Sequence, residues 1–121
     1  MEFDDDRPIY LQLLDDFKVK ISSGKWKSGQ KIDSVRNLAK SYQVNPNTVQ
    51  RALQELEREG LCESMRTMGR FVTEDKNLIN KLKDKAFDQA CDEFIEKSQA
   101  LEIGKNEALE KLGKYWEEVD D

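Results

Sequence analysis

Hydrophobic residues recur every three or four positions from residue 9 to residue 21, which predicts an amphipathic helix. The stripe consists of Ile9, Tyr10, Leu13, Leu14, Phe17 and Ile21. Pro8 suits the start of this helix because proline has a preset φ angle and lacks a backbone N–H, and Gly24 suits its end. The chain therefore opens with a helix of about four turns, preceded by a short acidic lead.

Two further helices are predicted, joined by a tight turn. The buried face of the first consists of Val35, Leu38, Ala39 and Tyr42, and that of the second of Val49, Ala52, Leu53 and Leu56. Asp33 or Ser34 can cap the first, and Asn45 caps the second, which begins with Pro46. One inward apolar residue in the turn, Val44, is typical of a helix-turn-helix, whose second helix is free to enter a DNA major groove.

A β-hairpin is predicted after Gly60, which ends the third helix. Its strands are Leu61 to Met65 and Arg70 to Thr73, and Gly69 supplies the unusual backbone angle that the hairpin tip needs. A single short strand is also predicted at residues 31 and 32. A hairpin directly after a helix-turn-helix corresponds to the wing of a winged helix-turn-helix.

The pattern then changes to one long helix from about residue 75 to residue 99. Its apolar positions are Leu78, Ile79, Leu82, Ala86, Phe87, Ala90, Cys91, Phe94 and Ile95. At ~1.5 Å per residue this helix is about 36 Å long, more than the small domain before it can cover. A break at residues 101 to 104 precedes a last helix that can fold back, with apolar positions Ala108, Leu109, Leu112, Tyr115, Trp116 and Val119.

These elements predict a mainly α fold with a small β-hairpin: a winged helix-turn-helix followed by a C-terminal two-helix dimerisation hairpin. The expected domains are an acidic flexible lead over residues 1–7, a DNA-binding domain over 8–73 and a helical dimerisation segment over 74–121. A second copy of the chain is expected to cover the last segment. The candidate interface residues are Leu78, Leu82, Phe87, Cys91, Phe94, Leu112 and Trp116.

Charge is unevenly distributed along the chain, although the net charge of −5 argues at first sight against a nucleic-acid partner. Residues 1–17 contain one Arg and six acidic residues, residues 18–70 contain eleven Lys and Arg and five acidic residues, and residues 71–121 contain eight Lys and fourteen acidic residues. A positive block of this kind is expected of a phosphate-binding surface, but a helical domain can also carry it by chance.

The residue types that the chain lacks narrow the classes of function that the sequence predicts. Without histidine there is no usual Ser-His or Cys-His pair, and no P-loop or dinucleotide motif appears, so the sequence predicts no enzyme, no cofactor and no metal. No stretch approaches ~20 consecutive apolar residues and no secretory signal is present, so a cytoplasmic protein without a membrane partner is expected. Cys62 and Cys91 are expected to be reduced thiols, and Cys91 a buried apolar residue.

Five segments in order resemble the GntR family of bacterial transcription regulators: Pro8-Ile9-Tyr10-Leu11-Gln12, Gly24-Lys25-Trp26-Lys27-Ser28-Gly29, Ser34-Val35-Arg36-Asn37-Leu38-Ala39, Val44-Asn45-Pro46-Asn47-Thr48-Val49 and Leu53-Gln54-Glu55-Leu56-Glu57-Arg58-Glu59-Gly60-Leu61. The tail looks like that of the YtrA-like subfamily. The resemblance implies a homodimer that binds a pseudo-palindromic operator in double-stranded DNA, usually as a repressor and often of transporter genes. About 48 residues are too few to enclose a usual ligand cavity of ~300 Å³, so any small-molecule effector is expected between chains.

Three positions depart from the family pattern. Asp33 stands where proline is common and adds a negative charge near the expected DNA face. The wing reads Arg-Thr-Met-Gly-Arg-Phe over residues 66–71, where Arg-Gly-x-Gly-Thr-Phe is commoner, so it has one glycine fewer and one arginine more. Lys105 stands where a capping Ser or Thr is usual, so the last helix is expected to begin at Asn106.

The candidate DNA contacts lie at the starts of the second and third helices and in the wing. They are Arg36, Asn45, Asn47, Thr48, Gln50, Arg51, Arg66, Thr67, Gly69 and Arg70. Arg36 suits a phosphate, Asn47 and Gln50 carry the donor and acceptor that suit adenine, and Arg51 suits guanine or phosphate.

Other roles remain open for several of these positions. Arg36 can instead form a salt bridge to a third-helix acid such as Glu55, and Asn45 can act as a cap alone. Trp26 is expected to pack in the core and Trp116 in a dimer interface, rather than in a nucleic-acid patch or a ligand cage. A protein-interaction adaptor that does not bind DNA is the main rival function.

Overall fold

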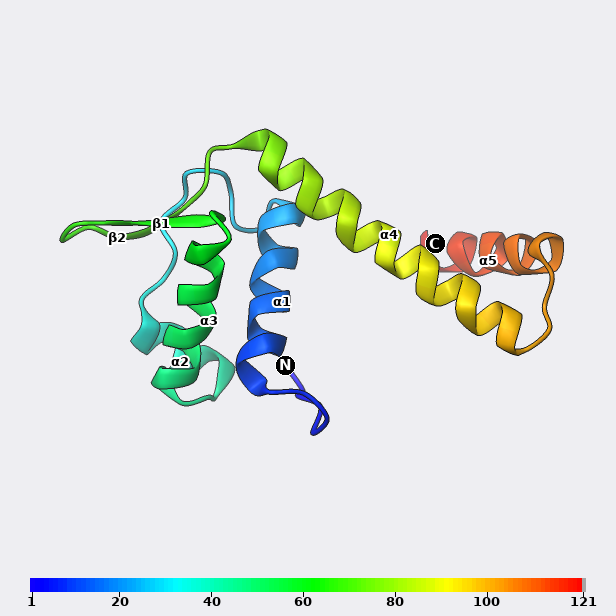
Figure 1. Ribbon diagram of the computed structural model, residues 1–121, viewed down its shortest axis with the longest axis horizontal. Helices are drawn as coiled ribbons and strands as arrows, with labels where there is room; N and C mark the ends of the chain where they lie inside the picture. The colour runs from blue at the N-terminus through cyan, green and yellow to red at the C-terminus, as the bar shows by residue number, and fades with distance from the viewer. Residues whose placement is uncertain (121) are drawn as a thin grey trace. The chain divides into compact units, whose positions relative to one another are not determined.

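The computed structural model describes residues 1–120, which form five helices and one two-stranded hairpin (Figure 1). In chain order the elements are α1 (Ile9–Ser23), α2 (Val35–Tyr42), α3 (Pro46–Arg58), β1 (Cys62–Met65), β2 (Gly69–Val72), α4 (Lys76–Ala100) and α5 (Lys105–Asp120). The chain divides into two compact units, Met1–Asp84 and Lys85 onward, and α4 contributes to both. The predicted mainly helical fold with a small hairpin is confirmed.

The core of the first unit lies where α1 and α2 pack against α3. It contains the predicted apolar faces of the three helices except Ile9, which is 43% exposed, together with Ile32, Leu61, Cys62 and Val72. Phe17 is completely buried at its centre. The Phe17 ring stacks on Trp26 with centroids 5.0 Å apart and meets the edge of Tyr42 at 5.7 Å. Trp26 is therefore a core-packing residue, as predicted.

Local side-chain chemistry sets the starts of α2 and α3. Ser34 is the N-cap of α2, because its Oγ accepts a hydrogen bond from the backbone N–H of Asn37 at 3.1 Å. Asp33 supports the same turn, since its Oδ1 accepts from the Ser34 N–H at 2.8 Å and from the Asn37 amide at 2.9 Å. Both residues proposed as caps thus act together at this helix start.

The hairpin is antiparallel, with Cys62 opposite Val72 and Met65 opposite Gly69. Thr67 has a φ of 65° and Gly69 a φ of 107°, so two tip residues take left-handed angles where the sequence predicted only the glycine. The loop before α2 extends this hairpin. Lys31 bridges to Phe71, and the Ile32 N–H donates to the Arg70 carbonyl at 2.9 Å. The short strand expected at residues 31 and 32 is a single bridge.

The second unit consists of the later part of α4 and α5, which runs back beside it (Figure 1). Between them, the Ile103 N–H donates to the Ser98 carbonyl at 2.9 Å, which ends α4. The last helix begins at Lys105 rather than at Asn106. The Ala108 N–H donates to the Gly104 carbonyl at 3.0 Å, so backbone hydrogen bonding starts this helix at Lys105 even though no Ser or Thr precedes it.

Two observations bear on the classes of function raised by the sequence. Among residues 1–120, no helix has the length and apolar character needed to cross a membrane. No group of three or more His, Cys, Asp or Glu side chains that could hold a metal ion was found in the same part of the chain. Cys62 and Cys91 are both free thiols; Cys62 is buried, but Cys91 is exposed in the single chain, where the sequence predicted a buried residue.

We expect the Cys62 thiol to react only when the protein unfolds. Burial in the apolar core, followed by the nearby Glu57 carboxylate, raises the pKa of Cys62 from 9.0 to about 11. At neutral pH its thiolate is therefore about 100-fold scarcer than in an exposed cysteine. In a Cys91→Ser variant, thiol labelling should be at least about 100-fold slower in buffer than in urea. Equal rates in the two conditions would contradict the buried position of Cys62.

Candidate nucleic-acid interface

The start of α3 is the most accessible part of the helix-turn-helix. Asn45, Asn47 and Arg51 are exposed, whereas Thr48 and Gln50 are half-buried. Val49 and Ala52, which point to the opposite side of the helix, are fully buried. The amphipathic pattern of α3 therefore anchors one face in the core and leaves its first two turns available to a partner.

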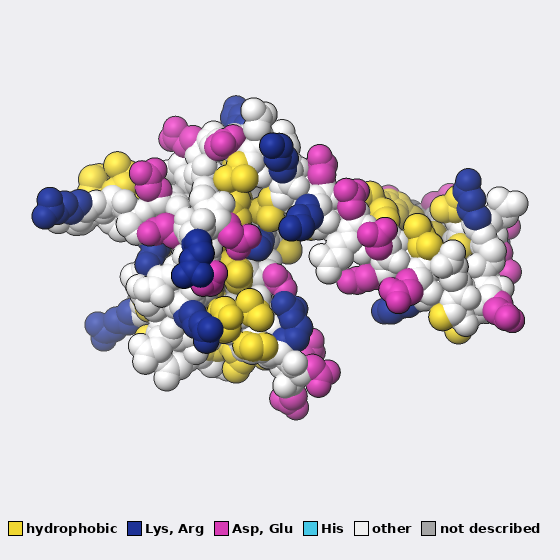
Figure 2. Space-filling model, in the orientation of Figure 1, with side chains coloured by type: hydrophobic (Ala, Val, Ile, Leu, Met, Phe, Trp, Pro, Cys, Tyr) yellow, Lys and Arg dark blue, Asp and Glu magenta, His cyan; other side chains and the backbone are white. Residues whose placement is uncertain are grey.

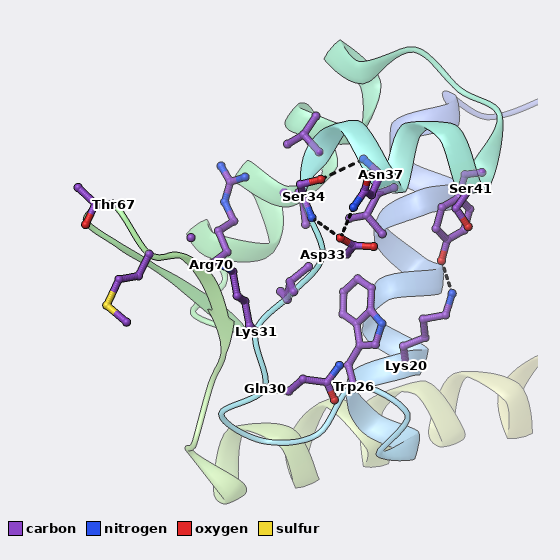
Figure 3. A pocket seen from close by; sticks show the side chains of 17 residues that line it. Lys20, Trp26, Gln30, Lys31, Asp33, Ser34, Asn37, Ser41, Thr67 and Arg70 are labelled. Carbon is purple, nitrogen blue, oxygen red and sulfur yellow. Dashed lines mark hydrogen bonds between the residues drawn. The ribbon is translucent and has the colours of Figure 1, made fainter.

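An open groove separates α2 from the wing in the first unit. It has a volume of about 980 Å³, and its lining includes Ser34 and Asn37 at the start of α2 and Thr67 and Arg70 of the hairpin (Figure 3). Trp26 lies at the base of this region, beside Lys20. Of the predicted contact residues, only Thr67, Gly69 and Arg70 of the wing line this groove, and Arg36 of α2 does not.

Arg36 is free to meet a phosphate. It is exposed, and it forms no ion pair within residues 1–120. The alternative partner suggested by the sequence, Glu55, instead pairs with Arg58 at 2.9 Å. The structure thus lacks the Arg36–Glu55 salt bridge that was the competing interpretation, and the phosphate contact stays a prediction.

Asn45 carries out the capping role that the sequence suggested. Its Oδ1 accepts a hydrogen bond from the Asn47 N–H at 2.8 Å, which leaves the exposed Asn47 side chain unused by the cap. The exposed amide N–H groups of Asn45 remain able to donate to a phosphate. A cap and a DNA contact are therefore compatible at this position.

Arg51 lies against an aromatic ring of α1. Its guanidinium carbon is 3.7 Å from the centroid of the Tyr10 ring. A planar guanidinium stacked on an aromatic face loses rotational freedom while its N–H donors stay available at the edge. Tyr10 was assigned only to the apolar stripe of α1, and no sequence spacing could have linked it to a residue 41 positions later.

The four wing candidates separate into two groups. Arg66, Thr67 and Gly69 are exposed at the hairpin tip, where Figure 2 shows basic side chains at the end of the hairpin. Arg70 differs, because its side chain is only 18% exposed and its Nε is 3.4 Å from Glu57 of α3. Arg70, which the sequence predicts to contact DNA, therefore contacts α3 of its own chain instead.

A polar cluster of Asp16, Lys20 and Tyr42 joins α1 to the end of α2. Lys20 and Tyr42 both donate to Oδ2 of Asp16, and Lys20 also contacts the Tyr42 hydroxyl. Burial raises the pKa of Asp16, but these hydrogen bonds and the Lys20 charge outweigh it and hold the pKa below its usual value. Asp16 therefore stays ionised at neutral pH, and the cluster fixes α2 on α1.

The predicted dimer residues fall into two places. Leu78 and Leu82 are half-buried against the core of the first unit, so the structure gives them a role within one chain. Phe87, Cys91, Phe94, Leu112 and Trp116 instead line an apolar groove of about 590 Å³ between α4 and α5 in the second unit. Figure 2 shows apolar side chains gathered between these helices. Phe87 and Trp116 remain 63% and 61% exposed.

Comparison with known proteins places these features among bacterial regulators. The family model described as bacterial regulatory proteins, gntR family, matches residues 9–72. The uncharacterized HTH-type transcriptional regulator YhcF of Bacillus subtilis (strain 168) is 34% identical over 116 residues, which are 96% of this chain and 96% of that protein. The HTH-type transcriptional repressor YtrA of the same organism is 44% identical over 68 residues, which are 56% of this chain and 52% of YtrA.

A solved structure gives the same picture for nearly the whole chain. The GntR family transcriptional regulator from Listeria monocytogenes aligns with a TM-score of 0.86 and 37% sequence identity. The alignment covers 93% of this chain and 98% of the Listeria protein. The likeness therefore includes the two helices that follow the wing as well as the helix-turn-helix.

Proposed function

The chain belongs to the GntR family of DNA-binding transcriptional regulators, and we propose that it is a homodimeric repressor that binds a pseudo-palindromic operator. The observation that carries this proposal is the exposed start of α3, together with an exposed wing tip and an exposed Arg36 that forms no ion pair within residues 1–120. A helix presented in this way fits the major groove of B-DNA.

The proposed DNA contacts divide by the chemistry of their side chains. Arg36 and the wing-tip residues Arg66, Thr67 and Gly69 hold phosphates or the adjacent minor groove, which sets the position of the protein on the duplex. Asn45, Asn47, Thr48, Gln50 and Arg51 on α3 approach the major groove. Because base edges carry a distinct donor and acceptor pattern there, sequence preference arises from this second group.

The proposed partner for the apolar groove of the second unit is the same groove of a second copy. Directly packed helices have axes about 8–10 Å apart and leave little space between them. Here a groove remains, and Leu109 and Tyr115 of α5 are exposed as well. An apolar surface that spreads over two helices suits a self-complementary interface better than a single small ligand.

Dimerisation would place two copies of α3 on successive half-sites, so that binding by the second copy becomes intramolecular. Repression is the proposed mode of action because the relative YtrA, similar over the DNA-binding region, is named a repressor. The proposed site of action is the bacterial cytoplasm, where the operator lies. The resemblance to YtrA-like regulators makes transporter genes the first targets to test by recovering bound DNA from cells.

DNA binding should depend steeply on salt, and Arg36 should contribute one phosphate contact. Each phosphate neutralised contributes about −0.9 to the slope of log affinity against log salt concentration. The Arg36→Ala variant should therefore show a slope about one unit shallower and weaker binding to all sequences alike. Fluorescence anisotropy with labelled duplex DNA at several salt concentrations measures both quantities.

Lys114→Ala provides the matched control, because Lys114 is an exposed cation of α5 that pairs with Glu110 at 3.7 Å, outside the proposed DNA surface. This variant should keep the slope of the unmodified protein. Wild-type protein that shows no salt-sensitive binding at low micromolar concentration would favour the rival function, a protein-interaction adaptor.

A further inference from the structure

Arg70 of the wing connects the hairpin to α3. Its Nε is 3.4 Å from Oε1 of Glu57, and its Nη1 donates to Oε1 of Gln50 at 3.5 Å. Glu57 and Gln50 lie on the same helix, seven residues apart. One wing side chain thus contacts α3 at two points two helical turns apart, and one of these is a proposed major-groove residue.

Glu57 of α3 holds the Arg70 side chain in place. Ser64 and Arg70 are opposite each other in the hairpin, and both donate to the same oxygen of Glu57. The carboxylate therefore binds both strands of the wing to α3. Since Arg70 is already paired with this carboxylate and mostly covered, it is poorly placed to neutralise a DNA phosphate.

The chemistry of the two partners decides the orientation of the Gln50 amide. A guanidinium has only hydrogen-bond donors, whereas an amide has one acceptor oxygen and one donor nitrogen. The oxygen of Gln50 must therefore face Arg70, which leaves the Nε2 donors for other partners. An adenine read by glutamine in the bidentate manner needs both the oxygen and the nitrogen, so the Arg70 guanidinium competes with the adenine amino group for the amide oxygen.

We propose that Arg70 is a positioning residue that makes Gln50 a hydrogen-bond donor in the major groove, so that the wing decides which base α3 reads. This inference rests on the proposed function. With its oxygen held by Arg70, Gln50 matches acceptors such as N7 and O6 of guanine or O4 of thymine. The adenine preference that the residue type alone suggests is replaced by a preference for guanine or thymine.

Binding-site selection with the full-length protein and randomised half-sites tests this assignment. Wild-type protein should enrich guanine or thymine at one position of each half-site, and Gln50→Ala should abolish the preference there. Arg70→Ala frees the amide oxygen and should raise the relative binding of adenine at that position by about 10-fold. Combining Arg70→Ala with Gln50→Ala should change that position no further than Gln50→Ala alone.

Arg66→Ala is the matched control, because Arg66 is an exposed arginine at the tip of the same wing. It should weaken binding without changing the preferred base. Glu57→Gln provides a second variant that keeps Arg70 but removes the charge that holds it, and it should shift the preference in the same direction as Arg70→Ala. Thermal unfolding of each variant checks that the hairpin remains folded.

Two results would overturn the positioning role. One is a Gln50-dependent preference for adenine in the wild-type protein. The other is an Arg70→Ala variant and a Glu57→Gln variant that both keep the wild-type base preference and only bind more weakly. Failure of the proposed function is distinguishable, because wild-type protein would then enrich no sequence at all, and that result would overturn both proposals.

Discussion

Replacing Phe94 with aspartate should shift the proposed dimer to a monomer and lower the affinity for a two-half-site operator by a factor of about 100 or more. Phe94 lies on α4 and lines the apolar groove between α4 and α5. A carboxylate in the proposed interface would lose its hydration without gaining a partner, which disfavours association. Each subunit would then bind its half-site independently, so the gain from an effectively intramolecular second contact disappears.

Val119→Asp is the control for this prediction. Val119 is an apolar residue of α5 that is 83% exposed and does not line the groove. Light scattering coupled to size exclusion should show a monomer for the Phe94 variant and a dimer for the Val119 variant. Binding to a duplex with one half-site should be equal for both, because the DNA-binding surface is unchanged. A Phe94→Asp protein that still elutes as a dimer would remove the groove from the interface.

Leu82 is less suitable for the same test, although the sequence places it on the same stripe of α4. Its side chain is half-buried against the core of the first unit, so an aspartate there would damage the DNA-binding unit as well. Loss of DNA binding by a Leu82→Asp variant would then have two causes, loss of the dimer and damage to the first unit. Phe94 lies in the second unit, so its substitution tests association without disturbing the core of the first unit.

The Phe17→Ala variant should lose about 3–5 kcal/mol of folding free energy. Phe17 is fully buried and contacts two other aromatic rings, Trp26 and Tyr42. Truncation removes apolar burial and leaves a cavity between α1, α2 and the loop that contains Trp26, and neighbouring side chains refill such a cavity only in part. Since domains of this size have a total stability of about 5–15 kcal/mol, this loss is a large share of the total.

Val19→Ala is the control on the same helix, because the Val19 side chain is 56% exposed and should cost little. Urea unfolding monitored by circular dichroism gives both values, at one fixed protein concentration because association stabilises the folded state. A loss below about 1 kcal/mol for Phe17→Ala would mean that the core does not depend on this ring.

The interpretations that held were those based on local chemistry. Pro8 and Gly24 bound α1, Ser34 and Asn45 cap the next two helices, and Gly69 takes the left-handed angle of the hairpin tip. Each depends on residues only a few positions apart, whose backbone preferences act wherever the chain is folded. The start of α5 was misplaced by one residue because the prediction required a side-chain cap, and backbone hydrogen bonding is sufficient there.

The roles of Arg51 on α3 and Arg70 in the wing could not be read from the sequence. Arg51 stacks on Tyr10 and Arg70 contacts Gln50 and Glu57. These partners are separated by 13 to 41 positions along the chain. Only the packing of α1, α3 and the hairpin around one core brings them together, and residue type alone does not specify that packing.

The sequence by itself determined the five helices, the hairpin and the excess of apolar surface after the wing, since periodicity and capping are local properties. The tertiary structure decided which part of that apolar surface packs within one chain and which part remains exposed. It placed Leu78 and Leu82 against the first unit and left Phe87, Phe94 and Trp116 around an open groove. It also turned Arg70 toward α3. Both outcomes depend on contacts between distant segments, which form only when the core assembles.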